Sequence, residues 1–190
     1  MNKKTLIISI ILAIVLMGVV LIYFVILKPS VVDNVNLPKN TIENESFSVK
    51  LPEGWVEIDP ISGSLAMAIK NEELIIDATA QGIGFRSYYS VLRDIYDKEN
   101  EQEYLNKVKD SLKQSFAEIA TTNEGTKETD NGKVYFIESK FNQQDIDFIV
   151  LLAIKIKDQN VWIMSFNTIE EKWEEYKNLF YQVAESFKIK

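Results

Sequence analysis

The middle of the chain contains the run IDFIVLLAIKIK, residues 146–157. Its centre is apolar at odd and even positions alike, with Phe148, Val150, Leu152 and Ile154 on one side and Ile149, Leu151 and Ala153 on the other. Successive side chains of a strand point to opposite faces, so this pattern is typical of a strand that is covered on both faces. We therefore expect residues 146–157 to lie in the centre of a layered domain.

The segments on either side of this run predict an antiparallel meander. Asn131-Gly132 separates residues 124–130 from residues 133–141, and this dipeptide between two alternating runs indicates a tight hairpin. Asp158-Gln159-Asn160 then turns the chain into residues 161–167. Because sequential strands are usually neighbours, we expect this last strand to pair with the central run.

Two segments have the period of an amphipathic helix. In residues 100–119 the apolar side chains recur at helical spacing: Tyr104, Val108, Leu112, Phe116 and Ile119. In the C-terminal segment they are Ile169, Trp173, Tyr176, Phe180, Val183 and Phe187. Thr168 and Glu171 predict a capping box at the start of this second helix. Each helix has one apolar face only, so each is expected to lie on the sheet.

The first half of the domain has shorter patterns. Strands are expected at residues 47–51, 55–58, 65–70 and 74–80, the last two forming a hairpin. Residues 86–97 are interpreted as a short helix, because Tyr89, Leu92 and Tyr96 fall at helical steps. With the meander and the two long helices, this order predicts an α+β layered domain.

An uncharged apolar segment precedes the domain. Residues 5–27 would form a helix about 34 Å long, enough to cross a hydrocarbon core of about 30 Å. A cleavable signal peptide would have a shorter apolar region ending in small residues, whereas this run ends in Tyr23-Phe24-Val25-Ile26-Leu27. We therefore interpret residues 5–27 as a transmembrane signal anchor, with a cleaved signal as the alternative.

The flanks of the apolar segment predict the organisation of the protein. Lys3 and Lys4 favour a cytoplasmic location for residues 1–4, so the cell membrane is expected to be crossed once. Residues 28–46 show neither the apolar period of a helix nor that of a strand, and they are interpreted as a tether. Residues 47–190 are then the extracytoplasmic domain.

The composition excludes several classes of protein. The 190 residues contain no Cys and no His, which excludes disulfide scaffolds, thiol nucleophiles, Cys-ligated metals and the usual general base. Four of the 21 Lys and Arg residues and one of the 28 Asp and Glu residues precede Asn40, so the remainder has a net charge of about −10. This charge argues against binding of nucleic acid.

No local pattern predicts a catalytic, cofactor or metal site. The densest acidic cluster consists of Asp94, Asp97, Glu99, Glu101 and Glu103. Its spacing differs from that of a calcium loop, so it is interpreted as a solvated helix face. Gly82-Ile83-Gly84 lacks the third glycine of a dinucleotide loop, and no serine is followed by lysine three positions later. Trp55, in the motif Pro52-Glu53-Gly54-Trp55, is expected to fill the end of the core.

Two motifs give the domain a resemblance to a known family. The opening FSVKLPEGW, residues 47–55, and the ending VAESFKIK, residues 183–190, resemble the PsbP-like (PsbP/DcrB-related) fold family over residues 45–190. The resemblance implies an αβα sandwich with a central antiparallel sheet. It also implies a binding role, because members of this family mainly bind or stabilise partner proteins. Many bacterial relatives carry a lipidated Cys, whereas this chain has the apolar span at residues 5–27 instead.

These observations predict a membrane-anchored bacterial module of the cell envelope that binds a protein partner and is not an enzyme. The alternative is a domain that binds a small ligand or a cation in a pocket between sheet and helix. A hydrolase that relies on a carboxylate pair is the least favoured function, because a domain with this many acids always offers some pair.

Overall fold

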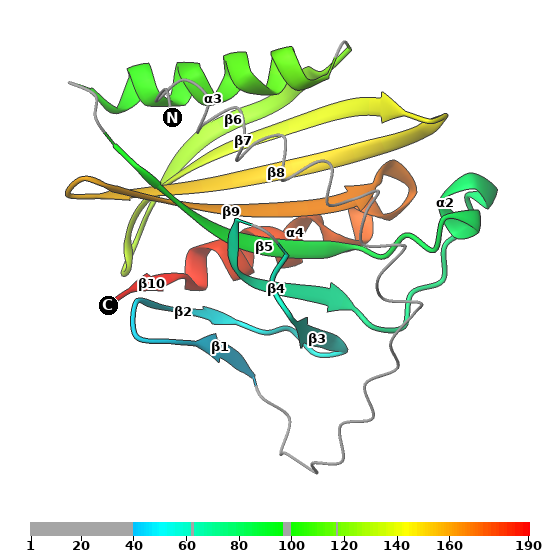
Figure 1. The fold of residues 1–190 in the computed structure, drawn as a ribbon, viewed down its shortest axis with the longest axis horizontal. Coiled ribbons are helices and arrows are strands. Elements are labelled where there is room, and N and C mark those ends of the chain that lie inside the picture. Colours follow the sequence, from blue (N-terminus) through cyan, green and yellow to red (C-terminus); the bar gives the residue numbers. More distant parts are fainter. Residues whose placement is uncertain (1–39, 62, 97–99, 117) are drawn as a thin grey trace.

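A computed structural model describes residues 40–61, 63–96, 100–116 and 118–190. Its main feature is a seven-stranded antiparallel sheet with the order β3-β4-β5-β9-β8-β7-β6 (Figure 1). In that order the strands are Trp55–Ile58, Ser64–Lys70, Tyr88–Ile95, Asn160–Ile169, Ile146–Lys157, Gly132–Gln143 and Ala120–Thr129. The predicted central strand is confirmed as β8, and its predicted antiparallel pairing with β9 and β7 is confirmed too.

Each face of the sheet is covered by one long helix. Helix α3, Glu101–Ser115, lies on one face, and helix α4, Glu170–Ser186, lies on the other (Figure 1). A three-stranded sheet of β1, Thr41–Glu43, β2, Phe47–Lys50, and β10, Lys188–Ile189, packs on the α4 side. The predicted α+β sandwich around an antiparallel sheet is therefore confirmed.

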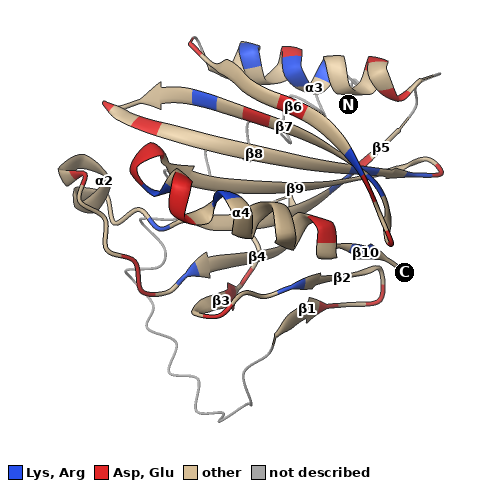
Figure 2. Cartoon of the chain, turned by 180° about the vertical axis from the view of Figure 1, so that it is seen from behind, with Lys and Arg blue, Asp and Glu red and all other residues tan. Residues whose placement is uncertain are grey.

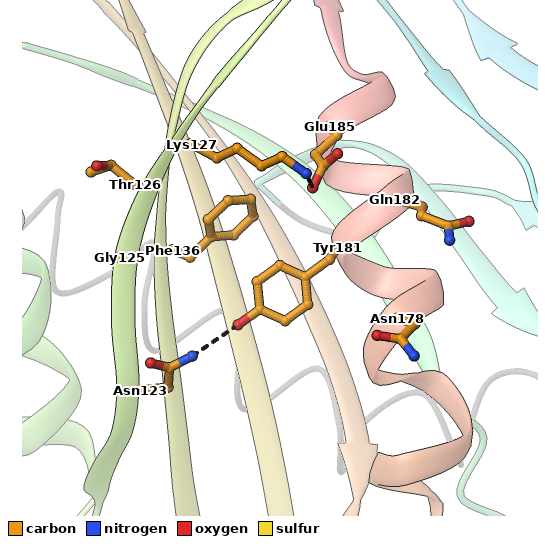
Figure 3. Close-up of a pocket in the computed structure, with 9 residues that line it drawn as sticks. All are labelled: Asn123, Gly125, Thr126, Lys127, Phe136, Asn178, Tyr181, Gln182 and Glu185. Atoms are coloured by element: carbon orange, nitrogen blue, oxygen red, sulfur yellow. Dashed lines mark hydrogen bonds and ion pairs between the residues drawn. The ribbon is translucent and has the colours of Figure 1, made fainter.

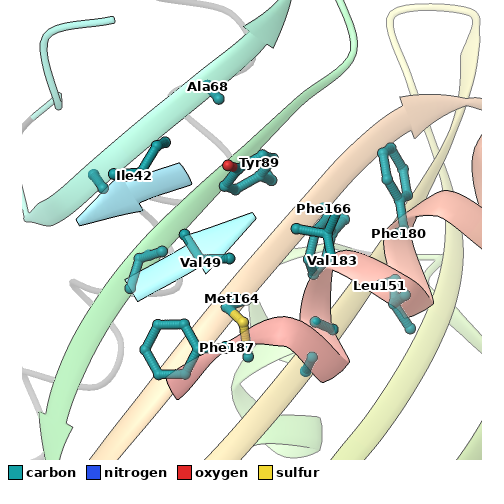
Figure 4. Close-up of a cluster of buried hydrophobic side chains, with 14 of the residues drawn as sticks. Ile42, Val49, Ala68, Tyr89, Leu151, Met164, Phe166, Phe180, Val183 and Phe187 are labelled. Carbon is teal, nitrogen blue, oxygen red and sulfur yellow. The ribbon is translucent and has the colours of Figure 1, made fainter. Parts of the chain in front are cut away.

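Strand β8 supplies side chains to both layers of the core. Leu151 and Ala153 belong to the cluster under α4, which also contains Phe166, Phe180 and Phe187 (Figure 4). The neighbouring side chains Val150, Leu152 and Ile154 belong to the cluster under α3. The alternation of a strand thus places successive apolar side chains in two separate cores.

The predicted role of Trp55 is confirmed. Its side chain is 5% exposed, and its ring lies 5.8–5.9 Å from the rings of Tyr89, Tyr176 and Phe180. Gly54, just before it, has a φ of 73°, a left-handed conformation that glycine adopts without a steric penalty. This turn brings the tryptophan from the small edge strand β3 onto the aromatic face of α4.

Two expectations for the first half of the domain are wrong. Residues 86–97 are not a helix: Tyr88–Ile95 is strand β5, paired on both sides with β4 and β9. Its apolar residues other than Ile95 are buried, on both faces of the sheet. A strand buried on both faces has apolar residues at every spacing, and these produced the apparent helical steps. Residues 74–80 are not a strand either. They contain a loop and the start of the short helix α2, Ala78–Gly82, which Asp77 caps by accepting a hydrogen bond from the Ala80 N–H.

The predicted boundaries of α4 and of the β6–β7 hairpin also differ from the structure. Thr168 remains in strand β9, so α4 has no side-chain N-cap and the predicted capping box is wrong. The hairpin turn consists of Asp130 and Asn131, one residue earlier than predicted, and Gly132 has a φ of 92°. Glycine accepts this conformation, so the turn can lead directly into β7.

The predicted anchor, residues 5–27, lies outside the described residues, as does most of the predicted tether. The end of that tether is an ordered part of the fold, because β1 lies within residues 28–46 and the Leu51 N–H donates a hydrogen bond to the Asn40 carbonyl. Within the part of the chain that the structure describes, no helix has the length and apolarity needed to cross a membrane.

Candidate functional site

A groove runs between helix α4 and the edge strand β6. Its volume is about 700 Å³ (Figure 3). One wall comes from β6 and the other from the solvent side of α4, with Phe136 of β7 between them. The lining residues are Asn123, Gly125, Thr126, Lys127, Phe136, Asn178, Tyr181, Gln182 and Glu185.

Gly125 keeps the middle of this groove open. It pairs directly with Phe136 in the β6–β7 register, so both positions face the same side of the sheet. A Cβ atom built on Gly125 meets no atom within 4 Å. The Phe136 ring packs against the Tyr181 ring of α4, with their centroids 4.8 Å apart. Two aromatic rings, those of Phe136 and Tyr181, therefore line the groove, and the absence of a side chain at Gly125 leaves space beside them.

The Tyr181 hydroxyl links the two walls of the groove. It accepts a hydrogen bond from the Asn123 side-chain amide at 3.4 Å and donates to Glu138 Oε2 at 3.5 Å. Burial raises the pKa of Tyr181 above its ordinary value, and the nearby Glu138 carboxylate raises it further. The hydroxyl is therefore neutral at physiological pH and can donate or accept a hydrogen bond.

Glu138 lies beneath the groove and is 6% exposed. Thr122 donates its hydroxyl to Glu138 Oε1 at 2.9 Å, and the Lys177 ammonium lies 3.9 Å from Glu138 Oε2. A buried carboxylate needs such partners, because an unpaired buried charge is costly. Through these contacts Glu138 joins β7 to β6 and α4.

The charges at the mouth of the groove are balanced. The Lys127 ammonium lies 2.7 Å from Glu185 Oε1, which joins β6 to the last turns of α4. Figure 2 shows acidic and basic positions together along α4. The other polar groups of the lining are the hydroxyls of Thr126 and Tyr181 and the amides of Asn123, Asn178 and Gln182, each of which can donate and accept. This lining is chemically suited to hydrogen-bonding uncharged polar groups.

The opposite face of β6 is hollowed as well. One hollow of about 230 Å³ is lined by Leu105, Tyr135 and Ile137 together with polar residues of α3 and β6. A second, of about 420 Å³, lies next to it between α3 and the start of β6. An ion pair between Lys109 of α3 and Glu124 of β6, at 2.9 Å, borders both hollows. Strand β6 is therefore flanked by open space on both faces.

The acidic cluster considered as a cation site is dispersed by the fold. Asp94 lies in β5 and is 5% exposed, where it accepts hydrogen bonds from the Tyr104 hydroxyl and the Ile95 N–H. The prediction of a solvated helix face is wrong for this residue, because residues 88–95 form a strand. Glu101 and Glu103 lie in the first turn of α3, and Asp97 and Glu99 lie outside the described residues. Among the residues that the structure describes, no three acidic side chains are grouped so as to hold a metal ion.

The groove is a site that the sequence motifs did not reveal. Its α4 wall consists of residues at helical spacing, Asn178, Tyr181, Gln182 and Glu185, of which Tyr181 is partly buried against the core. Such a stripe looks like an ordinary solvated face in the sequence. These residues form the wall of a groove only because β6 lies opposite them at the edge of the sheet, and that position depends on the order of the strands.

The comparisons with known proteins concern the whole fold. The sequence model of the PsbP family matches residues 39–189. The solution structure of cyanobacterial PsbP (CyanoP) from Synechocystis sp. PCC 6803 is similar with a TM-score of 0.60 and 14% identity, over 83% of this chain and 96% of that chain.

A second similar structure is that of LpqN, involved in cell envelope biogenesis of Mycobacterium tuberculosis. It has a TM-score of 0.57 and 6% identity, over 75% of this chain and 82% of that chain. No curated protein sequence matches the chain. At these identities the similar structures establish the fold alone.

Proposed function

The chain belongs to the PsbP family, and from that premise we propose that it is a non-catalytic accessory module that binds a protein partner at the cell envelope. Residues 5–27 would anchor it in the cell membrane, with residues 1–4 in the cytoplasm and the folded domain outside. The observation that carries the proposal is the open, charge-balanced groove beside β6, in a domain whose net charge is otherwise about −10.

This groove favours binding over catalysis. Its charged side chains are paired with each other, and its amides are suited to hydrogen bonding. A hydrolase would need a nucleophile or an activated water beside a base that is free to accept a proton. The carboxylate nearest to Tyr181, Glu138, is instead committed to Thr122 and Lys177. The involvement of LpqN, which has a similar fold, in cell envelope biogenesis supports a location at the envelope.

A small polar ligand is the second candidate, because the α4–β6 groove has a volume of about 700 Å³ between sheet and helix. Pockets of about 300–1,000 Å³ commonly bind small molecules. The groove is not enclosed, however, because it lies open along an exposed strand. An open groove of this kind suits an extended protein segment better than a small molecule, because a small molecule binds best when most of its surface is enclosed.

The experiment has a topology arm and a partner arm. The full-length protein should remain in the membrane pellet after an alkaline carbonate wash, and protease added outside the cell should digest the domain. A photo-crosslinking amino acid at the exposed groove position Gln182 should yield a discrete protein adduct in living cells, and the same group at the exposed position Glu53 should not. A soluble mature form would refute the anchor. Equal adducts at both positions, or none, would refute the partner site.

A further inference from the structure

We propose that β6 is a docking strand, to which an extended peptide segment of the partner protein adds as an eighth strand of the sheet. The segment would direct aliphatic side chains toward α3 and uncharged polar side chains toward α4. This inference rests on the proposed function and specifies how the partner is recognised.

The free edge of β6 is the first observation. Among the described residues β6 pairs with β7 on one side and with no strand on the other. After a bulge between Thr121 and Asn123 its pairing is regular to Thr129, a stretch of about 23 Å. The backbone N–H and C=O groups along the outer side are a template for another strand. The opposite edge of the sheet, β3, has only four residues.

The hollows on both faces of β6 are the second observation. The groove beside α4 and the two hollows beside α3 all include residues of β6. Side chains of an added strand would point alternately to the two faces. Each side chain would then have open space beside it, which a strand docking on a closed surface would lack.

The lining of the hollows indicates the chemistry of the segment. Toward α3, Leu105, Tyr135 and Ile137 provide apolar contacts. Toward α4, the amides of Asn123, Asn178 and Gln182 provide donors and acceptors. Lys109 is paired with Glu124 and Lys127 with Glu185. Asp110 and Lys113 contribute opposite charges to the second hollow, so the lining has no excess of either sign. A segment of alternating aliphatic and uncharged polar residues therefore fits better than a charged one.

Two other occupants are less favoured. Residues 31–37, VVDNVNL, partly share this alternation. The chain reaches the described part at Asn40, however, next to β1, and β1 belongs to the separate three-stranded sheet, not to the sheet that has β6 at its edge (Figures 1 and 2). A second copy of the domain would bring together two bodies that each carry a net charge of about −10, which repel.

The test uses the full-length chain in detergent micelles and a phage-displayed library of random peptides. We expect enriched peptides to alternate aliphatic with uncharged polar residues. Hydrogen–deuterium exchange should show that a bound synthetic peptide slows exchange of amides in residues 120–129. Gly125→Val should weaken binding at least tenfold, because its side chain occupies the open middle of the groove without meeting another atom. The control Gly82→Ala, in the distant helix α2, should leave binding unchanged.

Several outcomes would overturn the inference: no enrichment, exchange protection at another strand, or binding that Gly125→Val does not change. If β6 is already protected in the free chain and Val35→Asp exposes it, then residues 31–37 occupy the edge and the inference falls. If protection of β6 in the free chain instead rises with protein concentration, then a second copy occupies it and the inference also falls. Cross-linking at Gln182 that persists in these cases would preserve the proposed function and reject only strand addition.

Discussion

The ammonium group of Lys155 donates a hydrogen bond of 2.6 Å to the main-chain carbonyl of Phe187, so a lysine of the central sheet holds the C-terminal end of α4. The same ammonium lies 3.2 Å from the carbonyl of Asn131 in the β6–β7 turn. Lys155 is 2% exposed, and it joins the two elements that form the walls of the α4–β6 groove. Carbonyl groups at a helix C-terminus stabilise a nearby positive charge, which accounts for a buried lysine at this position.

The first prediction concerns the pH dependence of stability. Burial lowers the pKa of Lys155 to about 8, below the value of about 10.4 for an exposed lysine. Between these values the unfolded chain binds more protons than the folded one, so the free energy of unfolding rises with pH. Urea titrations between about pH 8 and pH 10 should show a rise of up to about 1.4 kcal/mol per pH unit.

The control for this prediction is Lys155→Met, which removes the titrating group and should flatten the rise. The measurements should stay below about pH 10, because burial raises the pKa of Tyr88 and Tyr104 in the folded state. Above that pH the unfolded chain loses the tyrosine protons first, so the wild type and the variant both lose stability. A variant whose stability rises as steeply as that of the wild type would show that Lys155 is not the source.

The second prediction concerns the aromatic stripe of α4. Phe180 is 1% exposed, and its ring centroid lies 5.1 Å from that of Phe166 and 5.7 Å from that of Tyr176. Phe180→Ala should lower the free energy of unfolding by about 3–5 kcal/mol, because it leaves a cavity between α4 and the sheet. Trp173→Ala should have a similar effect. Glu174→Ala, on the exposed side of the same helix, should stay within about 0.5 kcal/mol of the wild type in denaturant titrations.

The sequence predicted the parts of this fold in which periodicity and burial agree. Strand β8 and the two long helices have patterns that only one arrangement satisfies, and the family motifs at residues 47–55 and 183–190 indicated the remaining layers. Strand β5 was missed because it is buried on both faces, so its apolar residues fit a helix as well as a strand. Periodicity alone does not separate those two cases.

The candidate site was less predictable, for a different physical reason. Thr168 and Glu171 have the spacing of a capping box, but tertiary contacts use both side chains elsewhere. The Thr168 hydroxyl is 2.7 Å from that of Ser87 within the sheet, and Glu171 accepts two backbone hydrogen bonds from the loop before α2.

Likewise, the groove depends on which strand lies at the edge of the sheet. Such pairings between distant residues leave no local signal.

The third prediction concerns the loop before α2. Glu171 accepts hydrogen bonds from the Ile76 and Asp77 N–H groups, both at 2.8 Å. Hydrogen bonds to a charged group are worth about 1.5–3 kcal/mol when buried, and these are exposed, so Glu171→Ala should cost about 1 kcal/mol. The amides of Ile76 and Asp77 should exchange faster with deuterium in this variant. Unchanged exchange at both amides would mean that Ile75, which is buried, holds the loop by itself.

The fourth prediction compares two glycines that have different structural roles. Gly54 has a φ of 73°, and a Cβ atom there would lie 2.5 Å from the Lys70 ammonium nitrogen. Gly54→Ala should therefore destabilise the fold by about 1–2 kcal/mol, mainly because a side chain is strained in the left-handed conformation. Displacement of the flexible end of Lys70 adds little. Urea titration of the purified variant measures the change.

Gly125→Ala is the matched control, because its Cβ atom would meet nothing within 4 Å and its backbone is that of an ordinary strand. Alanine reduces the freedom of the unfolded chain and suits a strand at least as well as glycine, so stability should be unchanged or rise by up to about 1 kcal/mol. Equal losses in the two variants would contradict the assignment of Gly125 to the open groove. A loss at Gly54 alone would show that one glycine is required by the fold, while the other is free to serve binding.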